Sequence, residues 1–236
     1  MLFSHPFVSR FMSENFECAW ESAGEVPLVT IDFPGGERLK RTLGGNVATW
    51  LCTPEGGAFE LVAGIVEPDA YLLRLARARA FHTGLDEAPD ARAAVAERNG
   101  RLYAELATNL SSYTFGAPAA QPRLAVSKMM VEGPIKLALA DELRLTLSEE
   151  EIRFWEGTRE LVPRPPEALQ VDTLRNRAAR DAPAALLLSQ NPLAPPAQLT
   201  RRVYREILHL DLDDPYLGLA PLALGGEVGR ESAPGG

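Results

Sequence analysis

The stretch that decides the fold runs Val47-Ala48-Thr49-Trp50-Leu51-Cys52, Thr53-Pro54-Glu55-Gly56-Gly57 and Ala58-Phe59-Glu60-Leu61-Val62. The first part is a short apolar run typical of a buried strand, the second has the composition of a turn, and the third is a returning strand. Gly64 ends that strand, and Glu67-Pro68-Asp69 begins a helix. The residues of this helix expected to face inward are Tyr71, Leu72, Leu75 and Ala76. The sequence therefore predicts an antiparallel strand pair followed by a helix.

Three further elements are predicted before this stretch. Residues 4–15 have the apolar spacing of a short helix, and the alternation of Phe16, Cys18 and Trp20 predicts a strand over 16–20. Two alternating runs, 26–33 and 38–43, flank Pro34-Gly35-Gly36 and predict a β-hairpin.

Beyond residue 84 the composition changes and helical patterns dominate. The expected elements are, in order, a helix at 87–110, a linker at 114–124, a strand at 143–147, a helix begun by the capping box Ser148–Glu151, a helix at 167–189 interrupted near Pro183, and a helix starting at Pro195-Pro196. Residues 225–236 are poor in hydrophobic side chains and are predicted to be a disordered tail.

Composition excludes several classes of function. The chain has 236 residues, of which 46% are hydrophobic, so it can bury a sizeable core. Its net charge of -8 argues against nucleic acid as a partner, because backbone phosphates select a basic surface. There is neither an apolar run of about 20 residues nor a start typical of a signal peptide. With only two cysteines, these features predict a reduced cytoplasmic protein without a membrane partner.

The N-terminal third resembles the later part of a thioredoxin-like domain. The likeness covers residues 4–78 and is carried by Ser4–Val8 with Glu14–Phe16, and by 46–64 continuing into Pro68–Leu72. In that family a Cys-x-x-Cys motif precedes the first of these helices and a cis-proline precedes the strand equivalent to 47–52. This chain begins at the helix, and Asn46-Val47 contains no proline. The resemblance therefore implies a thioredoxin-like domain over residues 1–82 that lacks the machinery for dithiol exchange. The alternative is a redox protein whose true start lies upstream of Met1 and carries the motif.

The C-terminal part is similar to a segment of uncharacterised bacterial proteins that pair it with a thioredoxin-like N-terminal region. The likeness lies in Val203–His209 and Leu210–Leu219. Two motifs that precede this segment in the group are altered, because a Glu is missing from 172–177 and a His from 180–183. We thus expect a helix and linker over 83–122, a mostly helical region over 123–224 and the tail over 225–236.

The densest cluster of potential metal ligands is His209, Asp211, Asp213 and Asp214. Carboxylates spaced as Asp-x-Asp suit a hard divalent cation such as calcium, although the Gly and Glu required by an EF-hand loop are absent. Alternatively, the aspartates organise turns by accepting hydrogen bonds from backbone N–H groups, or they form a partner-binding surface.

Cys18 and Cys52 are the two candidate redox residues. Both lie in predicted strands, where we expect buried and inert thiols. A disulfide between them is conceivable only if no strand separates them, because two strand spacings exceed the Cα separation that a disulfide tolerates.

Together these features predict an α/β protein, an incomplete thioredoxin-like sheet-and-helix unit followed by a mostly helical C-terminal region. The function expected first is non-catalytic binding or scaffolding, with a protein partner or a second copy of the chain, no catalytic residues and no bound cofactor. The alternatives are the redox protein with an upstream motif and a metal-binding protein that uses the C-terminal aspartates and a divalent cation.

Overall fold

The computed structural model of the chain describes residues 2–25, 28–32, 34–36, 38–42, 47–112, 143–161, 179–215 and 217–218. Helices and two separate two-stranded antiparallel sheets make it a mixed α/β protein, as predicted. The chain divides into two compact units. The first unit comprises Met1–Ala19 and Val47–Pro196, and the second comprises Trp20–Asn46 and Ala197–Gly236.

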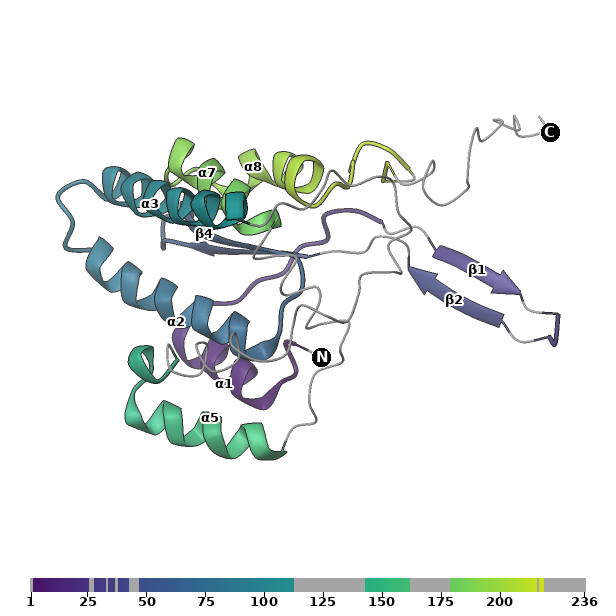
Figure 1. Ribbon diagram of the computed structural model, residues 1–236, viewed down its shortest axis with the longest axis horizontal. Helices are drawn as coiled ribbons and strands as arrows, with labels where there is room; N and C mark the ends of the chain where they lie inside the picture. Colours follow the sequence, from purple (N-terminus) through teal and green to yellow (C-terminus); the bar gives the residue numbers. More distant parts are fainter. Residues whose placement is uncertain are drawn as a thin grey trace. The chain divides into compact units, whose positions relative to one another are not determined.

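The first unit is built around the predicted strand pair. In chain order its elements are α1 (Pro6–Asn15), β3 (Ala48–Cys52), β4 (Ala58–Ala63), α2 (Pro68–Leu85), α3 (Ala91–Ser112), α5 (Glu149–Leu161) and α7 (Asp181–Gln190). Helices α3 and α7 pack together over one face of the β3–β4 sheet, and α2 covers the opposite face (Figure 1). Helices α1 and α5 complete the layer on the α2 side.

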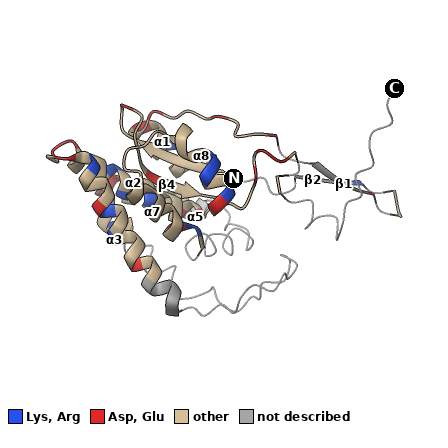
Figure 2. Ribbon diagram, turned by 90° about the horizontal axis from the view of Figure 1, so that it is seen from above, with Lys and Arg blue, Asp and Glu red and all other residues tan. Residues whose placement is uncertain are grey.

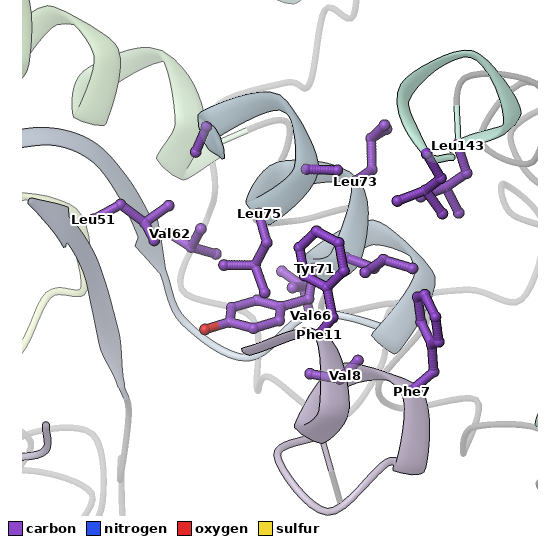
Figure 3. Close-up of a cluster of buried hydrophobic side chains, with 14 of the residues drawn as sticks. Phe7, Val8, Phe11, Leu51, Val62, Val66, Tyr71, Leu73, Leu75 and Leu143 are labelled. Carbon is purple, nitrogen blue, oxygen red and sulfur yellow. The ribbon is translucent and has the colours of Figure 1, made fainter. Parts of the chain in front are cut away.

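A hydrophobic core fills the space between the sheet and these helices. Phe7, Val8 and Phe11 of α1 are buried against α2, as their helical spacing predicts. Tyr71 of α2 lies in this cluster (Figure 3), and its hydroxyl donates a hydrogen bond to Thr49 Oγ1 of β3 at 3.3 Å. Every residue of β4 is buried, so helices cover both faces of this strand.

A β-bulge in β4 depends on α3 for its hydrogen bonds. Leu51 pairs with Glu60 and Cys52 with Ala58, so Phe59 is the extra residue on β4. The Phe59 carbonyl accepts hydrogen bonds from Asn99 Nδ2 at 3.2 Å and Arg98 Nη1 at 3.3 Å. Buried carbonyls need such partners, and α3 is therefore anchored to the sheet through polar contacts as well as apolar ones.

The predicted capping box at the start of α5 is confirmed. The backbone N–H of Glu151 donates to Ser148 Oγ at 3.3 Å, and the Ser148 N–H donates to Glu151 Oε2 at 2.8 Å. Both hydrogen bonds lie within four residues of chain, which is why the sequence pattern alone could predict them.

The prediction of strands at 16–20 and 143–147 is wrong. Residues 16–20 form no strand, and Cys18 and Trp20 are exposed although alternation would bury one face. Residues 143–146 form a helical turn, with the Leu147 N–H donating to the Leu143 carbonyl at 2.9 Å. The turn buries Leu143 and Leu147 and leaves Leu145 89% exposed. Leucines at every second position are compatible with a strand or with a helical turn. Burial of Leu143 and Leu147, which are four residues apart, is the pattern of a helix.

Other predictions for the C-terminal half are partly tested. Pro183 lies in the first turn of α7, directly after the π-helical residues 179–180, and the predicted helix before them lies outside the described residues. The expected linker at 114–124 and tail at 225–236 lie outside the described residues, as does most of the segment before α7. The domain boundaries at 82/83 and 122/123 stay predictions.

Gly57 has a structural role that the turn pattern did not indicate. A Cβ at this position would lie 2.9 Å from both the Cβ and the carbonyl oxygen of Leu193. The next residue, Ala58, donates its N–H to the Ala194 carbonyl at 3.0 Å. The segment after α7 is thereby held tightly against the β3–β4 turn.

We expect Gly57→Ala to lower the free energy of unfolding by about 1–3 kcal/mol, because Leu193 and its backbone must move. Gly100→Ala is the matched control, since Gly100 lies inside α3 with nothing within 4 Å of an added Cβ. That variant should gain up to about 1 kcal/mol from helix propensity. Urea unfolding followed by circular dichroism measures both changes, and equal shifts in the two variants would contradict the close approach at Gly57.

The second unit contains the predicted hairpin. Strands β1 (Leu28–Asp32) and β2 (Arg38–Thr42) pair antiparallel, from Leu28 opposite Thr42 to Asp32 opposite Arg38. Helix α8 begins at Pro196, the last residue of the first unit, and ends at Arg202. The chain continues as the π-helix η3 (Val203–Ile207), in which the Leu208 N–H donates to the Val203 carbonyl. Across the described residues, no helix combines the length and hydropathy needed to cross a bilayer.

Candidate functional site

The most accessible aromatic side chain in the described residues is Trp20, which is 91% exposed. It begins residues 20–25, Trp-Glu-Ser-Ala-Gly-Glu, and every residue of this acidic segment is exposed. No lysine or arginine occurs between Arg10 and Arg38, so Glu21 and Glu25 have no basic neighbour in sequence. Tryptophan is usually buried at least in part, and it is enriched at the centres of protein interfaces.

The acidic segment leads into the β1–β2 hairpin through residues 26 and 27 alone. Gly36, with φ of +85°, allows the tight turn between the strands. Asp32 and Arg38 close the hairpin near this turn, with Arg38 Nε donating to Asp32 Oδ1 at 2.5 Å. In the part of the chain that the structure describes, no third strand pairs with either outer edge of the hairpin. Strand β2 thus presents an edge whose sequence contains Arg38, Lys40 and Arg41 and no acidic residue.

The first unit contains a group of four charged side chains, in which two buried carboxylates pair with two partly exposed arginines. Glu60 of β4 is 4% exposed and Asp181 of α7 is 6% exposed. Arg74 of α2 contacts both carboxylates, with its Nη1 3.3 Å from Glu60 Oε1, and Arg98 Nη2 lies 2.5 Å from Glu60 Oε2. Although burial by itself lowers the pKa of Arg74, the carboxylates of Asp181 and Glu60 raise it overall. The group is balanced in charge and joins four elements, so we interpret it as structural.

Polar contacts also attach α5 to the rest of the first unit. Arg79 of α2 binds the Glu151 carboxylate with Nη1–Oε1 at 2.7 Å, and the same Nη1 donates to Asn15 Oδ1 at 2.8 Å. Burial alone would raise the pKa of Glu151, but its hydrogen bonds from Arg79 and Ser148 lower it. Trp155 Nε1 donates to Asp69 Oδ1 at 2.9 Å. These carboxylates already accept strong hydrogen bonds, which suits a structural role better than proton transfer.

The aspartates predicted as metal ligands take part in the hydrogen bonds of a tight loop. Asp211 Oδ1 accepts the N–H of Asp213 at 3.1 Å, and Asp214 Oδ2 accepts the N–H of Gly218 at 3.2 Å. Asp213 forms ion pairs with two arginines, Arg201 and Arg205. These hydrogen bonds are the kind expected if the aspartates organise turns, the alternative to a metal site.

His209, the fourth predicted ligand, is exposed and has a φ of +55°. Within the described residues, no group of three or more His, Cys, Asp or Glu side chains is arranged to hold a metal ion. A cation bound by Asp211, Asp213 and Asp214 would have to compete with the arginines for Asp213, and the metal site stays a prediction.

The expectation that both cysteines are buried is wrong. Cys18 and Cys52 are exposed and free, and Cys18 lies in the segment that forms no strand. Partial desolvation at the end of β3 raises the pKa of the Cys52 thiol. A raised pKa reduces the thiolate fraction, which is the reactive form in disulfide exchange.

His5 is the N-cap residue of α1, but its side chain makes no capping hydrogen bond. Its Nδ1 is buried and has no hydrogen-bond partner in the described part of the chain. Burial lowers the pKa of His5, and the opposing effect of the Asp69 carboxylate is smaller. Burial therefore favours the neutral form of the imidazole, and so does the positive end of the helix dipole, beside which His5 lies.

A hollow of about 420 Å³ lies along α3 and the end of α2. Charges of both signs occur along α3 (Figure 2). Both arginines of the hollow are paired with carboxylates, Arg101 with Glu97 and Arg98 with Glu60. Arg98 also stacks on the ring of Phe81, 4.6 Å from its centroid. Both arginines of the hollow are therefore already engaged with carboxylates.

Sequence reasoning placed Trp20 in a strand and missed its exposure. The sequence feature that could have indicated an exposed segment is the acidic composition of residues 11–37, which contain no lysine or arginine. Glu60 was read as part of a returning strand, and nothing local marked it as buried among arginines.

Comparisons of the chain with protein-family models, with curated proteins and with solved structures find no match.

Proposed function

We propose that this chain is a non-catalytic binding protein and that the acidic segment, residues 20–25, is its binding surface. The observation that carries the proposal is the 91% exposure of Trp20 within a segment exposed at every residue. A large aromatic side chain held in water gains hydrophobic free energy when a partner covers it. The neighbouring glutamates and the net charge of -8 favour a basic protein surface over nucleic acid.

The absence of catalysis is part of the proposal. It is supported by Glu60, Asp181 and Glu151, whose carboxylates are committed to arginines. It is supported further by Cys52, whose raised pKa disfavours nucleophilic attack. We also propose that α1, β3, β4 and α2 form the later part of a thioredoxin-like unit, because their order and the antiparallel pairing of β3 and β4 agree with that resemblance. A cytoplasmic location is consistent with two free thiols.

The test compares binding by the wild-type chain, Trp20→Ala and Ile65→Ala. Ile65 is the matched control, since it is 40% exposed and lies in the first unit. Proteins that co-purify with the wild-type chain are purified and titrated against each form by calorimetry. Loss of an interface tryptophan should raise the dissociation constant about thirtyfold or more, whereas Ile65→Ala should leave it unchanged.

Equal affinity of Trp20→Ala and wild type for every partner would contradict the proposed surface. Reduction of insulin by dithiothreitol is measured in parallel, and a rate above background would contradict the non-catalytic part of the proposal.

A further inference from the structure

We propose that β3 (Ala48–Cys52) pairs with β3 of a second copy of this chain, so that the two β3–β4 sheets join into one continuous antiparallel sheet. The contact uses residues of the first unit and none of the acidic segment, so the inference goes beyond the proposed function. Three observations carry it: the partial exposure of β3, its unpaired outer edge, and a sequence that lacks charge and proline along that edge.

Strand β3 is much less buried than β4. Every residue of β4 is buried, whereas β3 has one buried residue, Leu51, and ends at the exposed Cys52. The helices on the two faces of the sheet therefore leave β3 partly open to water. Residues 17–19 of the same unit are exposed as well, and in the described chain they form no backbone hydrogen bond with β3. The outer edge of the sheet is thus accessible to another strand.

The backbone of β3 has hydrogen-bonding groups that point away from β4. The Gly64 N–H donates to the Val47 carbonyl at 2.6 Å, and in an antiparallel pair alternate residues face the partner strand. Every second residue from Val47 onward therefore faces β4, whereas Ala48, Trp50 and Cys52 present their N–H and C=O groups to the outer side. Within the part of the chain that the structure describes, β4 is the one strand neighbour of β3, and no hydrogen bond reaches these outward groups. An added strand would satisfy them.

The sequence of β3 has none of the features that protect an open edge against pairing. Natural edge strands commonly carry lysines, prolines, inward-pointing charges or bulges that oppose contact with another strand. Residues 47–52, Val-Ala-Thr-Trp-Leu-Cys, contain no charged residue and no proline, and the extra residue of the bulge lies on β4. Two copies of this strand can therefore meet without repulsion between like charges, which favours a second copy as the occupant of the edge.

The outward groups of β3 are self-complementary about a two-fold axis. With Trp50 opposite Trp50 of the second copy, Ala48 lies opposite Cys52, and each of these pairs exchanges both backbone hydrogen bonds. The contact is the same on both copies, so the assembly closes as a dimer. Thr49 accepts a hydrogen bond from Tyr71 of α2, so the half-buried Trp50 next to it points to the opposite face of the sheet. There the two indole rings would pack against each other across the join.

Paired substitutions at residues 48 and 52 test this register. One variant carries Ala48→Lys with Cys52→Lys and places lysine opposite lysine at both positions across the join. The matched control carries Ala48→Lys with Cys52→Glu and places lysine opposite glutamate at both. Within one chain the two positions lie about 13 Å apart, beyond the Debye length of about 8 Å at physiological salt, so the variants differ mainly in the contact between copies.

Light scattering after gel filtration measures the mass of each form, and circular dichroism confirms that each variant retains the wild-type spectrum. We expect a wild-type dimer at about 100 µM, a dimer at least about tenfold weaker in the lysine–lysine variant, and a dimer within about threefold of wild type in the lysine–glutamate control. Trp20→Ala should dimerise as wild type does, because the acidic segment takes no part in the contact. A monomeric wild-type chain, equal dimerisation of the two paired variants, or loss of the dimer in Trp20→Ala overturns the inference.

Hydrogen exchange gives a second readout that needs no substitution. The outward N–H groups of Ala48, Trp50 and Cys52 should exchange more slowly at about 100 µM than at about 1 µM, because pairing with the second copy protects them. Equal exchange at the two concentrations overturns the inference, and this result stands even if one of the variants fails to fold.

Discussion

Replacing Arg74 by methionine is expected to lower the free energy of unfolding of the first unit by about 3–5 kcal/mol. The guanidinium lies between two buried carboxylates, with its Nη1 3.3 Å from Glu60 Oε1 and its Nη2 in contact with Asp181 Oδ2. Methionine fills much of the same volume but removes a positive charge, and a buried carboxylate that loses its counter-charge is strongly destabilising. The effect should exceed that of any exposed ion pair in the chain.

The matched control is Arg10→Met. Arg10 Nε binds Glu14 Oε1 at 2.7 Å, shorter than the Arg74–Glu60 contact, but both partners are about half exposed. Water and salt screen such a pair, so its loss should lower the free energy of unfolding far less than the loss of Arg74. Urea unfolding followed by circular dichroism gives both values. Similar losses in the two variants would show that the network around Glu60 is solvated and adds little to stability.

Trp155→Ala is expected to lower the free energy of unfolding by about 3–5 kcal/mol. Trp155 of α5 is 1% exposed and belongs to the core of the first unit, and its Nε1 donates to Asp69 in the first turn of α2. Alanine removes the ring from the core and leaves a cavity. Trp155→Phe keeps most of the apolar contact and removes the hydrogen bond, so it should cost less, with about 1 kcal/mol from the hydrogen bond itself.

Trp20→Ala is the control for this series, because a side chain that is 91% exposed contributes little to folding. Its free energy of unfolding should stay within about 0.5 kcal/mol of wild type. The same variant should lose partner binding, so stability and binding separate at the two tryptophans. A large loss of stability in Trp20→Ala would mean that the ring is buried in solution, and that result would undermine the proposed surface.

Elements whose signals are local could be predicted well. The Pro34-Gly35-Gly36 turn, the strand pair around Gly56-Gly57 and the Ser148–Glu151 capping box each depend on residues a few positions apart. In such cases the hydrogen bonds that define the element are made by the residues that signal it.

Alternation without a neighbouring strand misled the prediction twice. Residues 16–20 and 143–147 both show period-two patterns, yet the structure describes the first without strand pairing and the second as a helical turn followed by a bend. A strand exists only where another strand supplies hydrogen bonds, and no single segment carries that information. The exposure of Cys18 and Trp20 follows from the same missing partner.

Periodicity and turn chemistry are enough to predict the mixed α/β character, the two hairpins and the buried apolar faces of α1 and α2. Which charges are buried, and which aromatic ring is left in water, depends on contacts made in the tertiary fold. Glu60 and Asp181 are brought to the same arginine from positions 121 residues apart (181 minus 60), and Trp155 reaches Asp69 across 86. Burial and charge pairing depend on such distant neighbours. For that reason the exposure of Trp20, on which the proposed binding surface depends, is seen only in the tertiary structure.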